Sequence, residues 1–409
     1  MIHLLLTFLQ VIAILGCISS SAYYLFCLWS ADAFVRTRRQ SQIGSTPWLP
    51  PISVLKPLKG TDPEMYESFR SHCLQDYPQY EIIFGVSHAA DPAAGIVKQL
   101  QQEFPDRAIR LVVCAEKLGP NVKVSNLEQM VQASRFQFLI VNDSDIRVES
   151  DYLRRVVAPL AAADVGMVTC LYRGVAAATP GSKLEAVGIS TDFCPGVLVA
   201  QQLERGLHFG LGSTLAFRRD DLERIGGFRA LVDFLADDYE LGRRISALPK
   251  RVVLSDVVVE THLPEYDLSG FLSHQLRWFR GMRDARYRGY VGLVSTFGVM
   301  WGLLALLFAG GAPWSWAVLG AVFLLRTAVA LVFSRAVLQD EDAAEQLWLV
   351  PLRDLIAVGV WIASFTGHTV IWREQRFELK NGRLLPLRSQ SFRGDDAAIG
   401  SNRPSEKSR

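Results

Sequence analysis

The chain has 409 residues, half of them hydrophobic, and a formal net charge of only +2. A charge so close to zero gives no reason to expect nucleic acid as a partner. Apolar residues concentrate at the two ends, while the stretch from about 50 to 284 has an ordinary globular composition. No two cysteines form a C-x-x-C pair, so they are predicted to be reduced and structural, which suits a domain that faces the cytosol. They are Cys17, Cys27, Cys73, Cys114, Cys170 and Cys194.

The first element is an apolar run from Ile2 to Trp29, long enough to cross a bilayer of about 30 Å. No Lys or Arg precedes it, and Arg36, Arg38 and Arg39 follow it, which is the reverse of the order in a secretory signal peptide. The positive-inside rule places the amino terminus outside and the next segment in the cytoplasm. Residues 1–30 are therefore predicted to be a transmembrane anchor.

Residues 50–265 are predicted to form an α/β domain. Short apolar runs alternate there with helical patterns, which indicates βαβ units and a Rossmann-like, mixed and mostly parallel sheet. The predicted strands are 52–55, 80–86, 109–114, 138–141, 165–171 and 251–259, and the clearest helices are 93–104 and 124–134. A third helical pattern, 183–202, is expected to break at Cys194-Pro195-Gly196.

Polar side chains follow four of these strands, where open α/β sheets bind ligands. Asp91 can accept a hydrogen bond from a base or a ribose, and Lys56 or Lys123 can neutralise phosphate. Asp143 and Asp145 follow a buried strand and can share one divalent cation bound to two phosphates. This edge predicts a nucleoside diphosphate site, and the absence of a G-x-x-x-x-G-K-[ST] motif excludes a P-loop. The alternatives are an Asp-rich turn and solvated surface lysines.

Two further segments carry candidate chemistry. Asp237 and Asp238 precede a helical run at 239–247, where a carboxylate is stabilised as an anion and can serve as a general base; simple helix capping is the alternative. Asp237 is also a candidate for nucleotide binding. Residues 266–290 mix aromatic and basic residues at helical spacing and predict an interfacial helix, with four arginines directed to lipid headgroups: Arg280, Arg283, Arg286 and Arg288.

The region 291–375 is predicted to lie in the membrane. Segments 291–310 and 314–337 form a plausible hairpin, and 355–372 is a weaker third candidate. Three crossings would place the basic residues after 372 outside, against the positive-inside rule, so the last segment is expected to be re-entrant or interfacial unless the assumed orientation is wrong. Arg326 is expected to face protein rather than lipid. Residues 376–409 are predicted to be a polar tail, disordered from 389.

The order of these motifs resembles that of the ceramide glucosyltransferase family of membrane glycosyltransferases. Its D1, D2, D3 and (Q/R)xxRW signature is similar to Asp91, Asp143-Ser144-Asp145, Asp238 and Arg277-Trp278. The stretches 56–60, 117–127 and 146–148 are similar as well. The resemblance implies a GT-A domain, a UDP-sugar donor, a divalent cation (Mg²⁺ or Mn²⁺) and a membrane lipid as acceptor.

The resemblance also implies a role for each matched position. Asp91 would bind the nucleoside, Asp143 and Asp145 the metal–diphosphate, and Asp238 would be the catalytic base; Arg277 and Trp278 would close over the diphosphate and the acceptor. His274 stands where the signature expects Gln or Arg, with Gln275 one place later, and both are candidates for substrate binding. The alternative for His274 is an interfacial histidine without a role.

A bacterial branch is more closely similar, the hopanoid biosynthesis-associated glycosyltransferases, through residues 193–200, 235–239 and 274–278. This resemblance implies inverting transfer of glucose or N-acetylglucosamine from UDP to ceramide or a hopanoid polyol. The enzyme would lie in a bacterial inner membrane with its catalytic domain in the cytoplasm. The alternatives are a polyprenyl-phosphate glycosyltransferase, which needs no base, a processive polysaccharide synthase, and a non-catalytic membrane scaffold.

Overall fold

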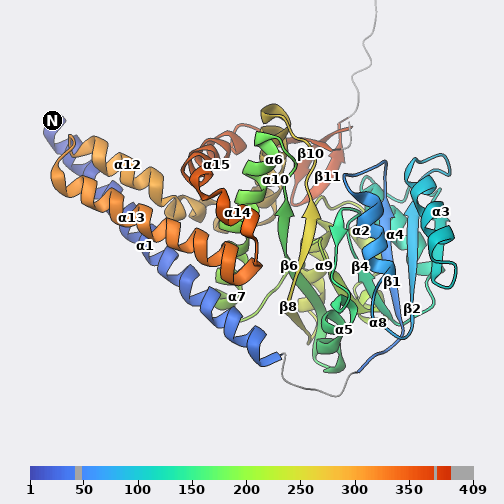
Figure 1. Ribbon diagram of the computed structural model, residues 1–409. Helices are drawn as coiled ribbons and strands as arrows, with labels where there is room; N and C mark the ends of the chain where they lie inside the picture. The colour runs from blue at the N-terminus through green and yellow to red at the C-terminus, as the bar shows by residue number, and fades with distance from the viewer. Residues whose placement is uncertain (42–47, 373–374, 388–409) are drawn as a thin grey trace, which may run out of the picture.

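The computed structural model describes residues 1–41, 48–372 and 375–387. A sheet domain lies beside an elongated bundle of apolar helices, and α10 (Leu268–Ala285) and α15 (Val350–Ser364) lie between the two (Figure 1). The predicted division into a central α/β domain and apolar ends therefore appears directly in the arrangement of the elements.

In the described residues the main sheet has eight strands in the order β3-β2-β1-β4-β7-β6-β8-β5. Their bounds are β1 Ile52–Leu58, β2 Tyr80–Val86, β3 Ala108–Val113, β4 Phe138–Val141, β5 Ile146–Arg147, β6 Val165–Val175, β7 Leu215–Arg218 and β8 Arg251–His262. The pairs β1–β2, β2–β3, β1–β4 and β6–β8 are parallel, and β4–β7, β6–β7 and β5–β8 are antiparallel. The predicted mixed, mostly parallel sheet is confirmed.

The main departures from the predicted strands are short or irregular elements. β1 extends to Leu58, so Lys56 lies inside the strand rather than after it. β7, four residues long, and β5, two residues long, were not predicted. Their ladders join segments far apart in the chain, such as Ile146 with Thr261 in β8, so no local alternation marks them.

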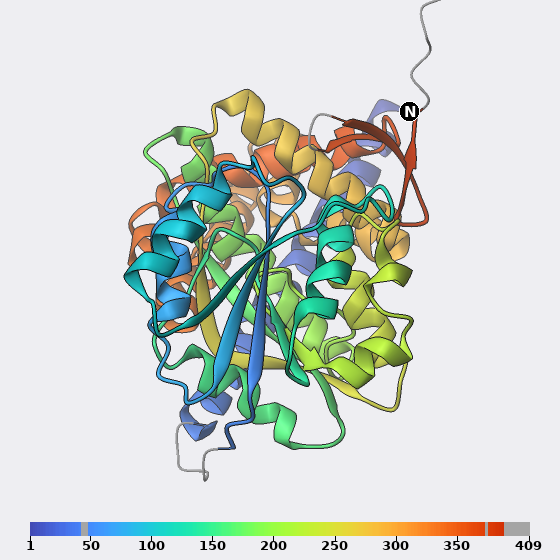
Figure 2. The same ribbon diagram turned by 90° about the vertical axis from the view of Figure 1, so that its right-hand side faces the viewer.

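Helices cover both faces of the sheet (Figure 2). They are α2 Met65–Cys73, α3 Ala93–Glu103, α4 Val122–Ala133, α5 Tyr152–Val157, α8 Arg219–Arg224 and α9 Asp237–Ser246, together with α6 Pro180–Gly188 and α7 Cys194–Leu203. The helix was predicted to break at Cys194-Pro195-Gly196, and this is wrong, because a π-helical turn, Ile189–Phe193, connects α6 to α7 without interrupting the helix. Such a turn accommodates the missing amide hydrogen of Pro195.

The apolar bundle contains α1 (Ile2–Ser41), α12 (Gly298–Phe308) and α13 (Pro313–Val332), which lie side by side in Figure 1. Three helical stretches in the described chain are long and apolar enough to cross a membrane: 2–40, 313–338 and 347–364. A fourth span results if 287–296 and 298–308, which meet at a bend of 54°, count as one. One amino-terminal and two to three carboxyl-terminal spans were predicted, and this is confirmed. The third segment is shifted, however, since α15 ends at Ser364 and Thr369–Trp372 forms strand β9.

Arg326 in α13 faces protein, as predicted. Its guanidinium donates to Asp354 of α15 at 2.7 Å and to Asp192 of the π-turn at 2.5 Å, and it is almost fully buried. A charge buried among apolar helices is tolerated when it is paired in this way. The ion pairs therefore join the helical bundle to the sheet domain.

The arginines of α10 have a different role from the predicted one. Arg283 is buried and donates to the carbonyls of Ser364 and Gly367, so the expectation that it meets lipid headgroups is wrong. Arg280 donates to the Thr369 carbonyl at 2.6 Å, and Arg286, at the end of α10, pairs with Glu204. These three side chains hold α10 to neighbouring segments of the protein.

The chain after α15 forms a small antiparallel sheet of β9, β10 (Gln375–Lys380) and β11 (Arg383–Pro386). The first residues of the predicted polar tail thus lie in strands. Its remainder, with the predicted disorder at 389–409, lies outside the described residues.

Candidate functional site

The carboxyl ends of β1, β2 and β4 meet at one edge of the sheet, and α10 crosses this edge (Figure 2). The ammonium of Lys123, in the first turn of α4, lies 2.7 Å from Asp143 Oδ1 and 3.3 Å from Asp237 Oδ2. Burial alone would lower the pKa of Lys123, but the negative charges of Asp143, Asp237 and Asp238 have the larger effect, so the pKa is raised. Predicted residues from three separate segments therefore converge here.

Asp238 lies in the first turn of α9 and faces the same edge. Its Oδ2 accepts from the Gly212 amide at 2.8 Å, and its Oδ1 accepts from the Tyr239 amide at 2.8 Å. Burial, with the neighbouring charge of Asp237, raises the pKa of Asp238 to about 6. The group is thus both oriented by backbone amides and ready to change protonation near neutral pH.

The backbone at Gly212 lies close to the side chains of both Asp143 and Asp238. A Cβ at this position would lie 2.9 Å from Asp143 Oδ2 and 3.2 Å from Asp238 Oδ2. Because glycine has no Cβ, other groups can approach its backbone closely. The structure shows which groups approach, and any side chain at this point would displace them.

Asp145 and the unpredicted Asp62 extend the acidic cluster. Asp145 accepts from the Thr261 hydroxyl of β8, and Ser144 donates to Asp62. Burial, followed by the charge of Asp143, raises the pKa of Asp145 to about 6. Asp62 follows the carboxyl end of β1, so the same strand-end signal that selected the other acids was available for it.

This cluster fits a divalent cation bound together with a diphosphate. The available ligands are carboxylate oxygens, which hard cations prefer. Burial first and the charge of Asp143 second raise the pKa of Asp145, and a bound cation would offset both effects. No group of three or more His, Cys, Asp or Glu in the described part of the chain is arranged to hold a metal. Asp143 and Asp145 would therefore need phosphate oxygens and water as the remaining ligands.

Two predicted nucleotide ligands have positions that constrain their roles. Asp91 accepts from the amides of Gly60, at 3.1 and 3.2 Å, and Ala93, at 3.0 Å, which joins the loops after β1 and β2. Lys56 is fully buried and donates to the Asp143 carbonyl at 2.9 Å; burial lowers its pKa to about 7. This burial leaves no surface for a phosphate, so the position of Lys56 favours support of the Asp143 loop over direct nucleotide contact.

A row of four aromatic rings, two of them from α10, borders the site. The His274 ring lies between Tyr266 and Trp278, with centroid separations of 5.4 and 5.7 Å. Trp278 meets Phe193 edge-on at 5.8 Å. Burial, followed by the charge of Glu185, raises the pKa of Tyr266 to about 12, and the charge of Arg277 acts in the opposite direction.

Gln275 points into the protein rather than toward the edge. Its amide nitrogen donates to Glu185 at 2.7 Å, and its oxygen accepts from Arg353 at 2.8 Å. His274 Nδ1 lies 3.5 Å from the other oxygen of Glu185. Because both ends of the amide are occupied inside the protein, the position of Gln275 favours orientation of α10 over direct substrate contact.

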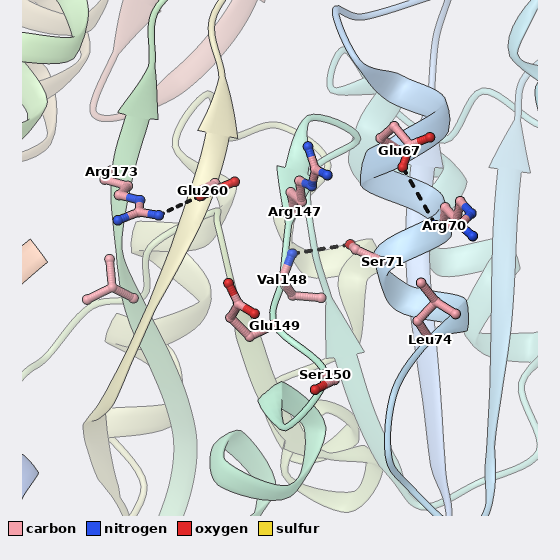
Figure 3. Close-up of a pocket in the computed structure, with 11 residues that line it drawn as sticks. Glu67, Arg70, Ser71, Leu74, Arg147, Val148, Glu149, Ser150, Arg173 and Glu260 are labelled. Carbon is pink, nitrogen blue, oxygen red and sulfur yellow. Dashed lines mark hydrogen bonds and ion pairs between the residues drawn. The ribbon is translucent and has the colours of Figure 1, made fainter. Parts of the chain in front are cut away.

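A cavity of about 310 Å³ lies away from these acids, between α2, β5 and β8 (Figure 3). Arg147 and Glu260, which pair across β5 and β8, line it. The next residue of β8, Thr261, contacts Asp145, and successive residues of a strand face opposite sides of a sheet. The cavity is therefore on the other face of this sheet edge and is not the site of the acids.

Comparison with known proteins identifies the family of this chain. The chain matches the model of glycosyl transferase family 21 over residues 12–385. It is 24% identical to ceramide glucosyltransferase 3 of Caenorhabditis elegans over 390 residues, which cover 89% of this chain and 81% of that protein. Ceramide glucosyltransferase 1 of the same organism is 23% identical over 412 residues, covering 95% and 84%.

Among solved structures, a mannosyltransferase from Pyrobaculum calidifontis in complex with GDP-Man and Mn²⁺ is similar, with a TM-score of 0.51 and 19% identity. The match covers 88% of this chain and 99% of that one. At this identity the likeness concerns the fold alone, and it confirms the expected GT-A architecture.

Proposed function

The chain belongs to glycosyl transferase family 21, and we propose that it transfers a sugar from a UDP-sugar to a hydroxyl of a membrane lipid, with inversion at the anomeric carbon. The observation that carries the proposal is the approach of Asp143 and Asp238 to one point of backbone at Gly212. In this proposal the leaving group binds on the Asp143 side of this point, and Asp238 is the base.

The diphosphate is proposed to bind at the strand ends. When bound there, a divalent cation held by Asp143 and Asp145 would offset the charge that develops on the leaving UDP. Lys123, held between Asp143 and Asp237, adds a fixed positive charge at the same place. Asp91, fixed to two backbone amides, is proposed to contact the nucleoside, as the family resemblance implies.

Asp238 is proposed to act as the general base. The lipid hydroxyl oxygen attacks the anomeric carbon from the face opposite the diphosphate, and the bond from that carbon to the phosphate oxygen breaks. The hydroxyl proton passes to Asp238 as UDP leaves. A pKa of about 6 suits this role, because the group is ionised at neutral pH yet accepts a proton more readily than an ordinary aspartate.

The lipid is proposed to approach along α10, where His274 and Trp278 form the aromatic row. The curated relatives are ceramide glucosyltransferases, and the bacterial branch resembled in sequence acts on hopanoids, so ceramide and a hopanoid polyol are the proposed acceptors, with UDP-glucose or UDP-N-acetylglucosamine as donor. Arg36, Arg38 and Arg39 at the end of α1 favour a cytoplasmic catalytic domain in a bacterial inner membrane.

The test is direct. Detergent-purified protein is incubated with Mg²⁺ or Mn²⁺, each UDP-sugar in turn, and ceramide or a hopanoid polyol, and the glycolipid is identified by mass and anomeric configuration. One of the donors should give a product, and its sugar, which is α-linked to UDP, should be β-linked to the lipid. A product with retained configuration, or transfer only to a polyprenyl phosphate, would contradict the proposed reaction.

A further inference from the structure

The C-terminal meander, defined as β9, β10 and β11, is attached to the catalytic domain although it follows the last membrane helix. Four of its residues are buried in a small core: Val370, Phe377, Leu379 and Leu384. Leu235 of the sheet domain packs against this core. Leu235 belongs to the base loop, defined here as residues 232–238, which ends in Asp237 and Asp238.

Backbone hydrogen bonds join the meander to the base loop. The Leu235 amide donates to the Gly382 carbonyl at 3.1 Å, and the Leu384 amide donates to the Asp233 carbonyl at 2.7 Å. The Arg383 guanidinium lies 5.3 Å from the centre of the Phe234 ring. The turn between β10 and β11 thus holds the base loop just before its catalytic aspartate.

The opposite side of the base loop is held by Asn121, the N-cap of α4. Its backbone amide donates to the Val232 carbonyl at 2.8 Å, and its side chain donates to the Phe234 carbonyl at 2.8 Å and to Asp237 at 3.3 Å. The base loop is therefore clamped between the helix that carries Lys123 and the C-terminal meander.

The same turn also holds α10. The Gly382 amide donates to Asp284, and Arg280 donates to the Thr369 carbonyl of β9 at 2.6 Å. Arg280 and Asp284 lie on α10, shortly after Trp278. The meander consequently connects the two parts of the proposed site that must act together, the base on one side and the Arg277-Trp278 segment on the other.

We propose that the C-terminal meander is a clamp that sets the distance between Asp238 and α10, with Gly382 and Asp284 as positioning residues. The inference rests on the proposed function. Small displacements of a reacting group lower rates steeply, by about 100-fold for 1 Å. A loosened clamp should therefore lower kcat while leaving UDP affinity, which depends on the strand ends, close to normal.

Gly382 offers a matched pair of variants, because its φ is +77° and a Cβ there would lie 3.4 Å from the Phe234 ring, an ordinary contact. Asn adopts this conformation readily and a β-branched residue does not. Gly382→Val is expected to lower kcat at least tenfold with UDP affinity within twofold, and Gly382→Asn is expected to restore most of the rate. Asp284→Ala, which removes the acceptor for the Gly382 amide, should act in the same direction, and Arg376→Ala on the exposed side of β10 is the control.

A second readout is independent of activity. Hydrogen exchange of the base loop in the full-length protein should accelerate at least tenfold in Gly382→Val and Asp284→Ala and stay unchanged in Arg376→Ala. If kcat and loop exchange are unaltered in both variants, or if Gly382→Asn is as impaired as Gly382→Val, the clamp is refuted. A wild type that transfers sugar to no lipid refutes the proposed function instead, and the exchange data then still decide on the clamp. If Gly382→Val does not fold, Asp284→Ala decides.

Discussion

Replacing Asp238 by Asn separates catalysis from folding. Both carboxylate oxygens accept backbone amides, from Gly212 and Tyr239, at 2.8 Å. The amide group of Asn presents a donor to one of them, and losing a hydrogen bond to a charged acceptor costs about 1.5–3 kcal/mol. The substitution also removes an unfavourable charge. Because folding raises the pKa of Asp238 from 3.8 to about 6, its ionised form destabilises the fold by about 3 kcal/mol at pH 7.

These two effects nearly cancel, so Asp238→Asn should fold with a thermal midpoint close to that of the wild type. Loss of a general base lowers kcat by about 100- to 10,000-fold. UDP binding, measured by calorimetry in the presence of Mn²⁺, should stay within a fewfold of normal, and kcat is measured by radiolabelled sugar transfer to lipid. Asp220→Asn, at an exposed aspartate of α8 outside the site, is the control and should retain full activity.

The reasoning fails if Asp238→Asn binds UDP and metal normally and still transfers sugar within tenfold of the wild-type rate. The acceptor would then need no base, as in transfer to a phosphate. A large loss of thermal stability would equally show that the carboxylate charge is not disfavoured in the folded protein.

Three further outcomes are expected. The rate should rise with pH through about 6 and be lost below it, because Asp238 accepts a proton only when ionised; a pH profile of kcat/KM checks this. Gly212→Ala should lower kcat more than tenfold without unfolding the protein, because its Cβ would meet Asp143 and Asp238; kcat and circular dichroism distinguish the two effects. Arg326→Ala should destabilise the protein by about 3–5 kcal/mol, since it leaves Asp354 buried without its partner, and the thermal midpoint in detergent measures it.

Several features followed from the sequence because their signals are local. In 138–145 a short apolar run is followed by two aspartates, so neighbouring residues alone predict both the strand and a candidate ligand-binding edge. The same holds for the acids at the start of α9 and for the uninterrupted apolar run of α1. Lys123 and Asp143 do meet, because parallel strands bring their carboxyl ends to one edge of the sheet. Asp237 and Asp238 reach the same edge from the start of α9, which only the tertiary structure shows.

The tertiary structure alone decided which distant segments touch. Lys56 was selected as a phosphate ligand by its position after an apolar run, but β1 continues past it and buries it beneath the Asp143 loop. Gln275 looked like a motif residue, yet Glu185 and Arg353 occupy its amide from two other helices.

The C-terminal meander shows the same limit most clearly. Its residues carry no local pattern that connects Gly382 with the loop before Asp238, more than 140 residues earlier. Local sequence fixes propensity and the polarity of each strand end, whereas contacts between remote segments depend on the register and packing of the whole chain. The polar residues that gather at this edge were therefore readable in the sequence, and the contacts that hold them in place were not.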